Sequence, residues 1–485
     1  MSIFGNFFNK GQQKAQPGRW KVGDNIAIDY KVLMVLGGEG KSGMGVIYVC
    51  LYKPHNRIYA LKTIQEKYSF SEASQKLFEK EATIWTELDR CPFIVRAHWV
   101  IRLEGRLFIA LEYIWPDMRG RNTLTHYLGK LSLPEIIKLS IQFCYGMEYA
   151  HSRGIDAHRD IKPDNIMVSK HKDIKITDFG LAKVFQEMQF NGDVISQEGK
   201  PSLSVFQSKG KNICGTLPYM APEQFDGYAD RRSDVYAFGI TLFQMVAGGA
   251  LPFVGATQLD YEALHKLQPL PFISSPLFAI MQRCVEKNPA TRYEDFSCVR
   301  ADLEKLFLKE TGKTFPPPEE KPYTAEELIF KGFALDELGK SAEAVSCYDR
   351  AIKIDPNYLG AYWCKGDALL NLGKSSEAIS SYDREIEMRT QYVPKALWGK
   401  MLALIQLDRH EEALACYDSL FNKAIKKAVG INFNKEDKFI VLANFLSGQN
   451  KCNEALKCIN EALRLNPNLS EAQKSRDAIL QKLGK

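Results

Sequence analysis

A run of three prolines at positions 316–318 divides the 485-residue chain into two parts with different sequence patterns. Consecutive prolines cannot continue a helix, so residues 311–322 predict a stiff, extended linker. Residues 26–310 alternate strand-like and helix-like patterns, whereas residues 323–485 follow a helical period almost throughout. Residues 1–25 are largely polar and predict a flexible leader. We therefore expect two folded domains joined by a linker.

The composition is typical of a reduced, globular protein. Hydrophobic residues make up 45% of the chain and charged residues 25%, which suffices for large buried cores. The formal net charge of +6 is small for this length and no basic stripe accompanies it, so we expect no nucleic-acid partner. Eleven cysteines without a Cys-x-x-Cys pair argue against disulfides and zinc ribbons. Since no secretory leader is recognisable either, we expect a cytoplasmic location.

Residues 235–259 carry no charged side chain and are long enough to raise the question of a membrane helix. Gln244 lies in the middle of this stretch, and Gly248, Gly249 and Pro252 interrupt it. These residues favour a buried helix followed by a loop, so we expect no membrane span.

The first domain begins with strands and continues with helices. Apolar runs predict strands at residues 30–36, 45–50, 58–62, 106–114, 166–168 and 174–176. Residues 71–89 have helical spacing with Glu81 and Trp85 on one face, and helical patterns dominate from residue 133 onward. We therefore expect an α+β domain, with a small sheet-rich lobe followed by a large helical lobe.

Two features of the sheet-rich lobe point to phosphate binding. Glycines crowd the turn at residues 36–48, where backbone N–H groups can approach a phosphate because no Cβ intervenes; a flexible hairpin is the alternative. Lys62 ends a strand, and a lysine buried at a lobe interface needs a carboxylate, which Glu81 can supply. Such a pair could position nucleotide phosphates, although an ordinary surface ion pair has the same sequence signature.

The densest polar motif is HRDIKPDN at residues 158–165. Asp160 could accept or orient a hydroxyl proton, Lys162 could neutralise a transferred phosphoryl group, and Asn165 could bind a hard cation through oxygen. Asp178, in TDFG at residues 177–180, offers a second oxygen ligand for Mg²⁺. A solvated polar turn is the alternative, but chance rarely produces this string.

Further downstream, GTLPYMAPE spans residues 215–223. The glycine-rich turn, Ala-Leu-Lys ending at Lys62, Glu81, HRDIKPDN, DFG and APE follow one another in an order that resembles eukaryotic-type (Hanks-type) protein kinases. HRDIKPDN and GTLPYMAPEQ resemble the serine/threonine branch, and the Gly-Met-Gly turn resembles its bacterial members. The resemblance covers residues 28–308. It implies a bilobal protein kinase fold that uses ATP and Mg²⁺ to phosphorylate Ser or Thr hydroxyls of proteins.

The resemblance implies individual roles. It implies catalytic roles for Lys62, Glu81, Asp160 and Lys162, and Mg²⁺ binding by Asn165 and Asp178. It implies nucleotide contacts for Gly40, Ser42, Gly43, Gly45, Ile47, Ala60, Lys62, Glu112, Ile114 and Met167. Of these, Ile47, Ala60 and Met167 would enclose the adenine, and the hinge at residues 112–114 would bind its edge behind the gating residue Leu111. The turn is longer than the family pattern by residues 37–39, which leaves its register open.

Scaffold roles are implied as well. Trp85, His158 and Phe179 would form a packing column that aligns the two lobes. Asp234 would tether the HRDIKPDN loop, and Arg292 would pair with Glu223.

The long segment from Asp178 to Glu223 predicts regulation. It contains Ser196, Ser202, Ser204 and Ser208, and Arg159 could pair with a phosphate placed there. We expect phosphorylation to switch the enzyme, in trans between two copies of a dimer. An insert with incidental serines is the alternative.

The region after the linker repeats at an offset of 34 residues. KGFAL at 331–335 corresponds to KGDAL at 365–369, and two weaker units follow before a final helix at 469–483. The pattern resembles tetratricopeptide repeats, an all-α solenoid that implies a docking groove for a protein or peptide. Expected groove residues are Ile329, Phe333, Trp363, Leu370, Trp398, Leu402 and Ile405. Packing within the array or against the first domain is the equal alternative.

Three functions remain open on the sequence. The first is an active serine/threonine protein kinase whose repeats recruit or regulate. The second is a nucleotide-binding pseudokinase scaffold, which usually lacks one of the residues corresponding to Lys62, Asp160 or Asp178. The third is a kinase for small molecules, against which the segment 215–223 argues, because in the family it shapes a platform for peptide substrates.

Overall fold

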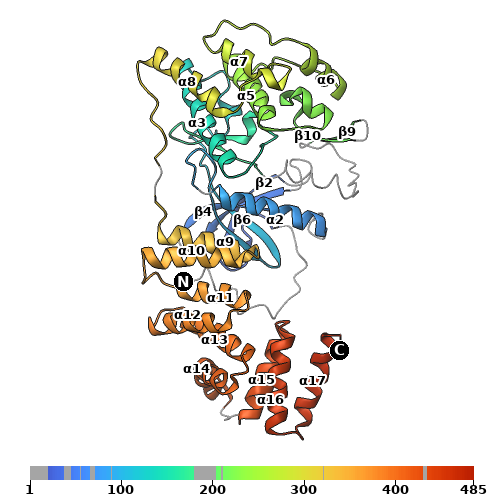
Figure 1. Ribbon diagram of the computed structural model, residues 1–485, viewed down its shortest axis with the longest axis vertical. Coiled ribbons are helices and arrows are strands. Elements are labelled where there is room, and N and C mark those ends of the chain that lie inside the picture. The colour runs from blue at the N-terminus through green and yellow to red at the C-terminus, as the bar shows by residue number, and fades with distance from the viewer. Residues whose placement is uncertain are drawn as a thin grey trace. The chain divides into compact units, whose positions relative to one another are not determined.

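A computed structural model describes residues 20–37, 45–54, 56–65, 71–88, 90–179, 204–208, 211–319, 322–429 and 434–484 (Figure 1). The chain divides into two compact units, one from Pro17 to Lys321 and one that contains residues 322–485. The first unit holds a sheet-rich and a helical lobe and the second is built of helices, so the expected fold class is confirmed.

The sheet-rich lobe is a six-stranded antiparallel sheet in the order β1-β2-β3-β4-β6-β5. Its strands are β1 (Asn25–Ile26), β2 (Tyr30–Gly37), β3 (Gly45–Tyr52), β4 (Arg57–Ile64), β5 (Ala97–Leu103) and β6 (Arg106–Glu112). Helix α2 (Glu72–Glu87) packs beside it, and the side chain of Ser71 caps the helix by accepting a hydrogen bond from the N–H of Ser74. The sequence missed β1 and β5. Strand β5 is buried over most of its length, so it lacks the alternation that identifies a half-buried strand.

Trp20 lies within the segment expected to be a flexible leader, but it packs on the sheet. Its ring contacts Tyr48 and Phe108 at centroid distances of 5.6 and 5.8 Å, and the guanidinium of Arg106 lies 5.4 Å from it. Residues 1–19 lie outside the described part of the chain. At its C-terminal end, the segment 1–25 therefore belongs to the folded lobe.

The helical lobe is organised around α5, in which all but three of the sixteen residues are buried. Its helices are α3 (Leu133–Ser152), α5 (Arg231–Val246), α6 (Gln258–Leu267), α7 (Phe278–Cys284) and α8 (Phe296–Thr311), with short 3₁₀ turns η2 (Leu124–Tyr127), η3 (Pro163–Asn165), η4 (Leu217–Tyr219), η5 (Pro222–Asp226) and η6 (Pro289–Thr291). Two hairpins accompany them: β7 (Ile166–Val168) with β8 (Ile174–Ile176), and β9 (Ser204–Ser208) with β10 (Lys211–Gly215). Helix α5 and the loop that follows it account for the uncharged stretch, as expected. In the described part of the chain, no helix has the length and apolarity to cross a membrane.

In its described residues, the second unit has four helix pairs and a final helix. These are α9 (Ala325–Glu337) with α10 (Ser341–Ile354), α11 (Ala361–Asn371) with α12 (Ser375–Glu387), α13 (Val393–Gln406) with α14 (His410–Val429), α15 (Lys435–Gly448) with α16 (Cys452–Leu465), and α17 (Ser470–Lys482). The turn inside each pair contains one residue in the left-handed backbone conformation. The φ angles are 77° for Gly339, 74° for Gly373, 58° for Asp408 and 59° for Asn450. Asp and Asn tolerate this conformation better than other non-glycine residues, which explains how the two weaker repeats keep the turn.

The expected groove residues are mostly buried. Ile329, Trp363, Leu402 and Ile405 belong to the continuous core of the array, with exposed fractions of 5% or less. Of the two alternatives, packing within the array therefore holds for these four residues, and lining a ligand groove does not. Phe333, Leu370 and Trp398 are half-buried. A helix such as α11 contacts the helices before and after it along the array, so apolar residues on both of its sides pack inside the array.

Candidate active site

The HRDIKPDN loop folds into a compact polar cluster at the edge of the helical lobe. The ammonium of Lys162 lies 2.8 Å from Oδ2 of Asp160, and the Thr216 hydroxyl donates to Oδ1 of Asp160 at 2.7 Å. The Thr216 oxygen in turn accepts from Lys162 at 2.8 Å. Both carboxylate oxygens of Asp160 therefore have a partner, and only 8% of the residue is exposed.

Asp234, near the start of α5, binds the backbone of this loop. Its carboxylate accepts hydrogen bonds from the backbone N–H groups of His158 and Arg159, at 2.6 and 2.8 Å. Burial raises the pKa of Asp234 to about 6 in spite of these bonds. The position of Asp234 is the one expected from the resemblance.

The lysine of β4 makes the expected ion pair with α2. Lys62 Nζ lies 2.6 Å from Glu81 Oε1 and 2.7 Å from Asp178 Oδ1. Burial opposes the charge of Lys62, but Asp178 and Glu81 outweigh it and raise the pKa of the ammonium. Burial likewise opposes ionisation of Asp178, but the charge of Lys62 lowers its pKa. Lys62 and Asp178 therefore both carry their charges at neutral pH.

Three rings connect α2 to this loop. Trp85 meets Phe179 edge to face at 5.9 Å, and Phe179 lies 4.7 Å from His158. The expected column of these three side chains is present. Arg159, which follows His158, and Asp178, which precedes Phe179, have φ angles of 68° and 64°. This left-handed conformation costs energy for non-glycine residues, and it is found most often at functional sites.

Asn165 and Asp178 carry oxygens that suit a hard cation. Nδ2 of Asn165 donates to the carbonyl and to Oδ2 of Asp160, at 2.8 and 2.9 Å, which leaves its amide oxygen as an acceptor. Lys62 contacts Asp178 through Oδ1, and among the described residues Oδ2 of Asp178 is left as a second possible cation ligand. Two such oxygens match the way proteins bind Mg²⁺ together with substrate phosphates. Within the described ranges, no group of three or more His, Cys, Asp or Glu could form an all-protein metal cage.

The expected adenine contacts lie on facing strands. Ile47 is paired with Lys62 in the β3–β4 ladder and Ala60 with Leu111 in the β4–β6 ladder, so Ile47, Ala60 and Lys62 share one face of the sheet. Met167 lies in β7 of the helical lobe. Gly45 begins β3, whereas Gly40, Ser42 and Gly43 lie outside the described residues.

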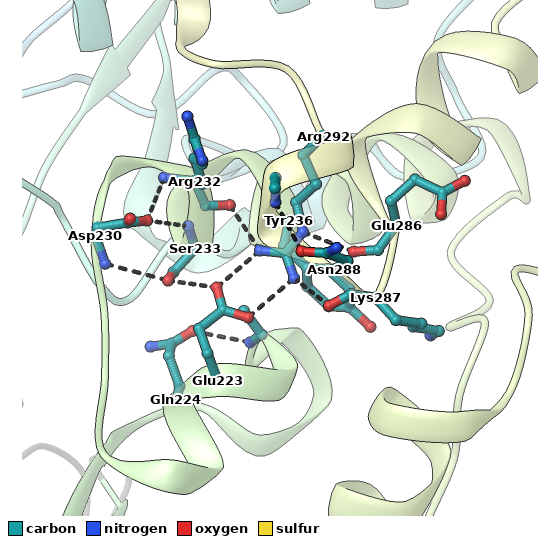
Figure 2. A network of polar contacts seen from close by, with 12 residues as sticks. Glu223, Gln224, Asp230, Arg232, Ser233, Tyr236, Glu286, Lys287, Asn288 and Arg292 are labelled. Carbon is teal, nitrogen blue, oxygen red and sulfur yellow. Dashed lines mark hydrogen bonds and ion pairs between the residues drawn. The ribbon is translucent and has the colours of Figure 1, made fainter.

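The Ala-Pro-Glu motif is tied to α5 and to the segment after α7 (Figure 2). Arg292 donates to both oxygens of Glu223, at 2.7 and 2.9 Å, and to the carbonyl of Glu286 at 2.6 Å. The hydroxyl of Ser233 donates to Glu223 at 2.7 Å, and Asp230 caps the start of α5. This network confirms the expected Glu223–Arg292 pair and fixes the segment that begins at Thr216.

The serines expected to be phosphorylated are only partly described, and two residues outside the motifs contact the hinge. Ser196 and Ser202 lie outside the described residues, and only the backbone of β9 is described at Ser204 and Ser208. Sequence reasoning did not single out Lys175 or Asn122, which contact the hinge. Neither belongs to a recognisable motif, and only their partners in space identify them.

Family models match most of the chain. The model of the protein kinase domain matches residues 30–303, and two models of tetratricopeptide repeats match residues 334–384 and 365–423. The chain therefore belongs to the protein kinase family and carries tetratricopeptide repeats. Protein kinases in general use ATP and Mg²⁺, and tetratricopeptide repeats are protein-interaction modules.

Bacterial relatives are serine/threonine-protein kinases by name. A probable serine/threonine-protein kinase of Clostridium perfringens is 29% identical over 293 residues, which cover 59% of this chain and 39% of that protein. Serine/threonine-protein kinase pkn3 of Myxococcus xanthus is 28% identical over 309 residues, 58% of this chain and 51% of the relative. Serine/threonine-protein kinase PrkC of Bacillus subtilis is 28% identical over 334 residues, which cover 66% of this chain and 47% of that protein. The chain thus spans about half or less of these relatives.

Proposed function

We propose that this protein is a serine/threonine protein kinase. The observation that carries the proposal is the closed set of contacts among Asp160, Lys162 and Thr216, which presents one carboxylate and one ammonium at the same point. Asp160 orients the acceptor hydroxyl and accepts its proton as the oxygen attacks the γ-phosphorus. The bond to the β–γ bridging oxygen breaks and ADP leaves, while Lys162 neutralises charge on the transferred group.

The remaining polar residues position the nucleotide. Lys62, held by Glu81, binds phosphate oxygens, and residues 112–114 bind the adenine edge between Ile47, Ala60 and Met167. Gly40, Ser42, Gly43 and Gly45 supply backbone N–H groups to the phosphates. Asn165 and Asp178 would hold Mg²⁺, which would supply neutralisation of the phosphate charge.

The same proposal covers partners and regulation. Proteins are the substrates, the repeats at residues 323–485 dock a protein partner, and two copies phosphorylate one another in the segment between Asp178 and Glu223. The protein acts in the cytoplasm, and the kinase domain comprises residues 26–310. These statements rest on the family, on the chemistry of the segment and on the composition.

A pseudokinase scaffold is not favoured. Lys62, Asp160, Asn165 and Asp178 are all present, and their side chains form the contacts described above. Loss of one of these residues is what usually disables a protein kinase, and none is lost.

The test is phosphoryl transfer with labelled ATP, Mg²⁺ and a generic protein acceptor. Asp160→Ala and Asp178→Ala should each lower the rate by at least about 10³-fold, because positioning and charge neutralisation provide most of the catalysis. Asp156→Ala removes an exposed carboxylate four residues before Asp160 and should leave the rate unchanged. Near-wild-type turnover by either of the first two variants contradicts the proposal.

Regulation has a separate test. Phosphosites of the active full-length protein should include a Ser or Thr between residues 183 and 215, and Arg159→Gln should lower the activity gained on phosphorylation. Active protein without any modification in this range contradicts this part of the proposal.

A further inference from the structure

The hinge at residues 112–114 is attached at both ends to one hairpin of the helical lobe, β7–β8. This arrangement involves Lys175 and Asn122, which none of the motifs contains. Both attachments are made by side chains: Lys175 is 63 residues from its partner Glu112, and Asn122 is eight residues from its partner Ile114.

The first attachment is at Glu112, where β6 ends. Oε2 of Glu112 accepts from Lys175 Nζ at 2.8 Å and from the backbone N–H of Arg96 at 3.3 Å. The side chains of Lys175 and Glu112 are 18% and 30% exposed, so water screens this pair only in part. Lys175 is the middle residue of β8 and pairs with Met167 of β7.

The second attachment is at Ile114, two residues later. Nδ2 of Asn122 donates to the carbonyl of Ile114 at 3.2 Å. The carbonyl of Asn122 accepts from the N–H of Val168 at 2.9 Å, and Thr123 forms a bridge with Met167. Asn122 therefore joins the end of the hinge to β7, as Lys175 joins its beginning to β8.

We propose that Lys175 and Asn122 are positioning residues that hold the hinge backbone in the geometry that binds adenine. This inference rests on the proposed function and adds two residues to it. A hinge fixed before binding loses less conformational freedom when the nucleotide arrives, so the attachments raise ATP affinity. They do not touch Asp160, Lys162 or Thr216, so the chemical step should not depend on them.

The experiment compares Lys175→Met, Asn122→Ala and the double variant with two controls in the full-length protein. Lys175→Arg keeps the cation and should restore wild-type behaviour. Lys138→Met breaks the partly exposed Lys138–Asp173 pair at 2.8 Å, which involves the loop of the same hairpin but not the hinge. Equilibrium affinity for a fluorescent ATP analogue with Mg²⁺, KM for ATP and kcat are measured for each.

Each single variant should weaken nucleotide affinity and raise KM about two- to fivefold, the factor that loss of one partly exposed polar contact produces. The kcat should stay within about twofold of wild type. A fall in kcat at unchanged KM, or equal effects of Lys175→Met and Lys138→Met, overturns the proposal.

Hydrogen exchange of the nucleotide-free protein separates this proposal from the proposed function. Amides of residues 112–115 should exchange faster in Lys175→Met and Asn122→Ala than in wild type, and not in Lys138→Met. If the wild type binds no nucleotide, the proposed function is wrong, and the exchange rates still decide whether the two residues hold the hinge. Unchanged exchange in both variants overturns the inference.

Discussion

Lys62 and Glu81 lie 2.6 Å apart, with only 6% and 3% of their side chains exposed. One belongs to the sheet and the other to α2, so the pair fixes the helix against the sheet at the point where Asp178 also contacts the lysine. A surface ion pair, the alternative that the sequence left open, is therefore excluded by burial.

Lys62→Met should abolish phosphoryl transfer and destabilise the kinase unit by about 3 kcal/mol, because it leaves a buried carboxylate without a cation. Urea denaturation and ATP turnover measure the two effects. Lys76→Met, which breaks the exposed Lys76–Glu72 pair on the same helix, should change neither. Recovery of stability without activity in Lys62→Met/Glu81→Leu would confirm that the unpaired charge causes the loss of stability.

Arg292→Lys should destabilise the protein by about 3 kcal/mol, since lysine cannot reproduce the two parallel bonds to Glu223 and the Arg292 side chain is fully buried. The denaturation midpoint reports this change. Arg300→Lys is the matched control, because Arg300 also binds both oxygens of a glutamate, Glu148, but is 23% exposed. It should cost less than about 1 kcal/mol, and equal losses in the two variants would contradict our account of the network.

Gly366→Ala should destabilise the repeat array by about 1–3 kcal/mol, because a Cβ there would lie 2.5 Å from the ring of Tyr382. That ring also closes on Gly399, where a Cβ would lie 2.3 Å away, so it has little room to move. Gly448→Ala at the end of α15 meets nothing within 4 Å and should be neutral or slightly stabilising. Thermal unfolding of the full chain distinguishes them.

Asp367 makes the stability of the array depend on pH. Burial raises its pKa to about 7, against an ordinary value of 3.8; the Tyr382 hydroxyl bound to it and the nearby Lys395 and Lys451 oppose this rise, and Asp336 adds to it. The folded state therefore takes up a proton that the unfolded state releases, so this contribution to stability is complete below pH 3.8 and is lost as the pH rises through 7.

Asp367→Asn keeps an acceptor for Tyr382 without the charge. Relative to wild type, it should raise the unfolding temperature more at pH 8 than at pH 6, with a free-energy difference on the order of 1–2 kcal/mol between the two pH values. Calorimetry at both pH values measures it. A variant that shifts by the same amount at both would show that Asp367 does not titrate in this range.

Local patterns in the sequence predicted most of the first domain. Strands β2, β3, β4 and β6, helix α2 and the hairpin β7–β8 all appear near their expected positions. The motifs and the family they resemble predicted the Lys62–Glu81 pair, the Asp234 tether and the Glu223–Arg292 pair. They did not predict that Thr216 contacts Asp160 or that Asp178 contacts Lys62. The buried strand β5 and the packing of Trp20 left no comparable local pattern.

The sequence by itself determined the two-unit organisation, the repeat turn and the residues of the candidate site, since period, turn residues and motif order are local properties of the chain. Only the tertiary structure decided that Trp363 and Ile405 are core residues, that Asp367 and Asp234 are desolvated, and that Lys175 and Asn122 hold the hinge. An apolar stripe indicates that a face is buried but not against what, and burial, pKa and attachment depend on segments far apart along the chain.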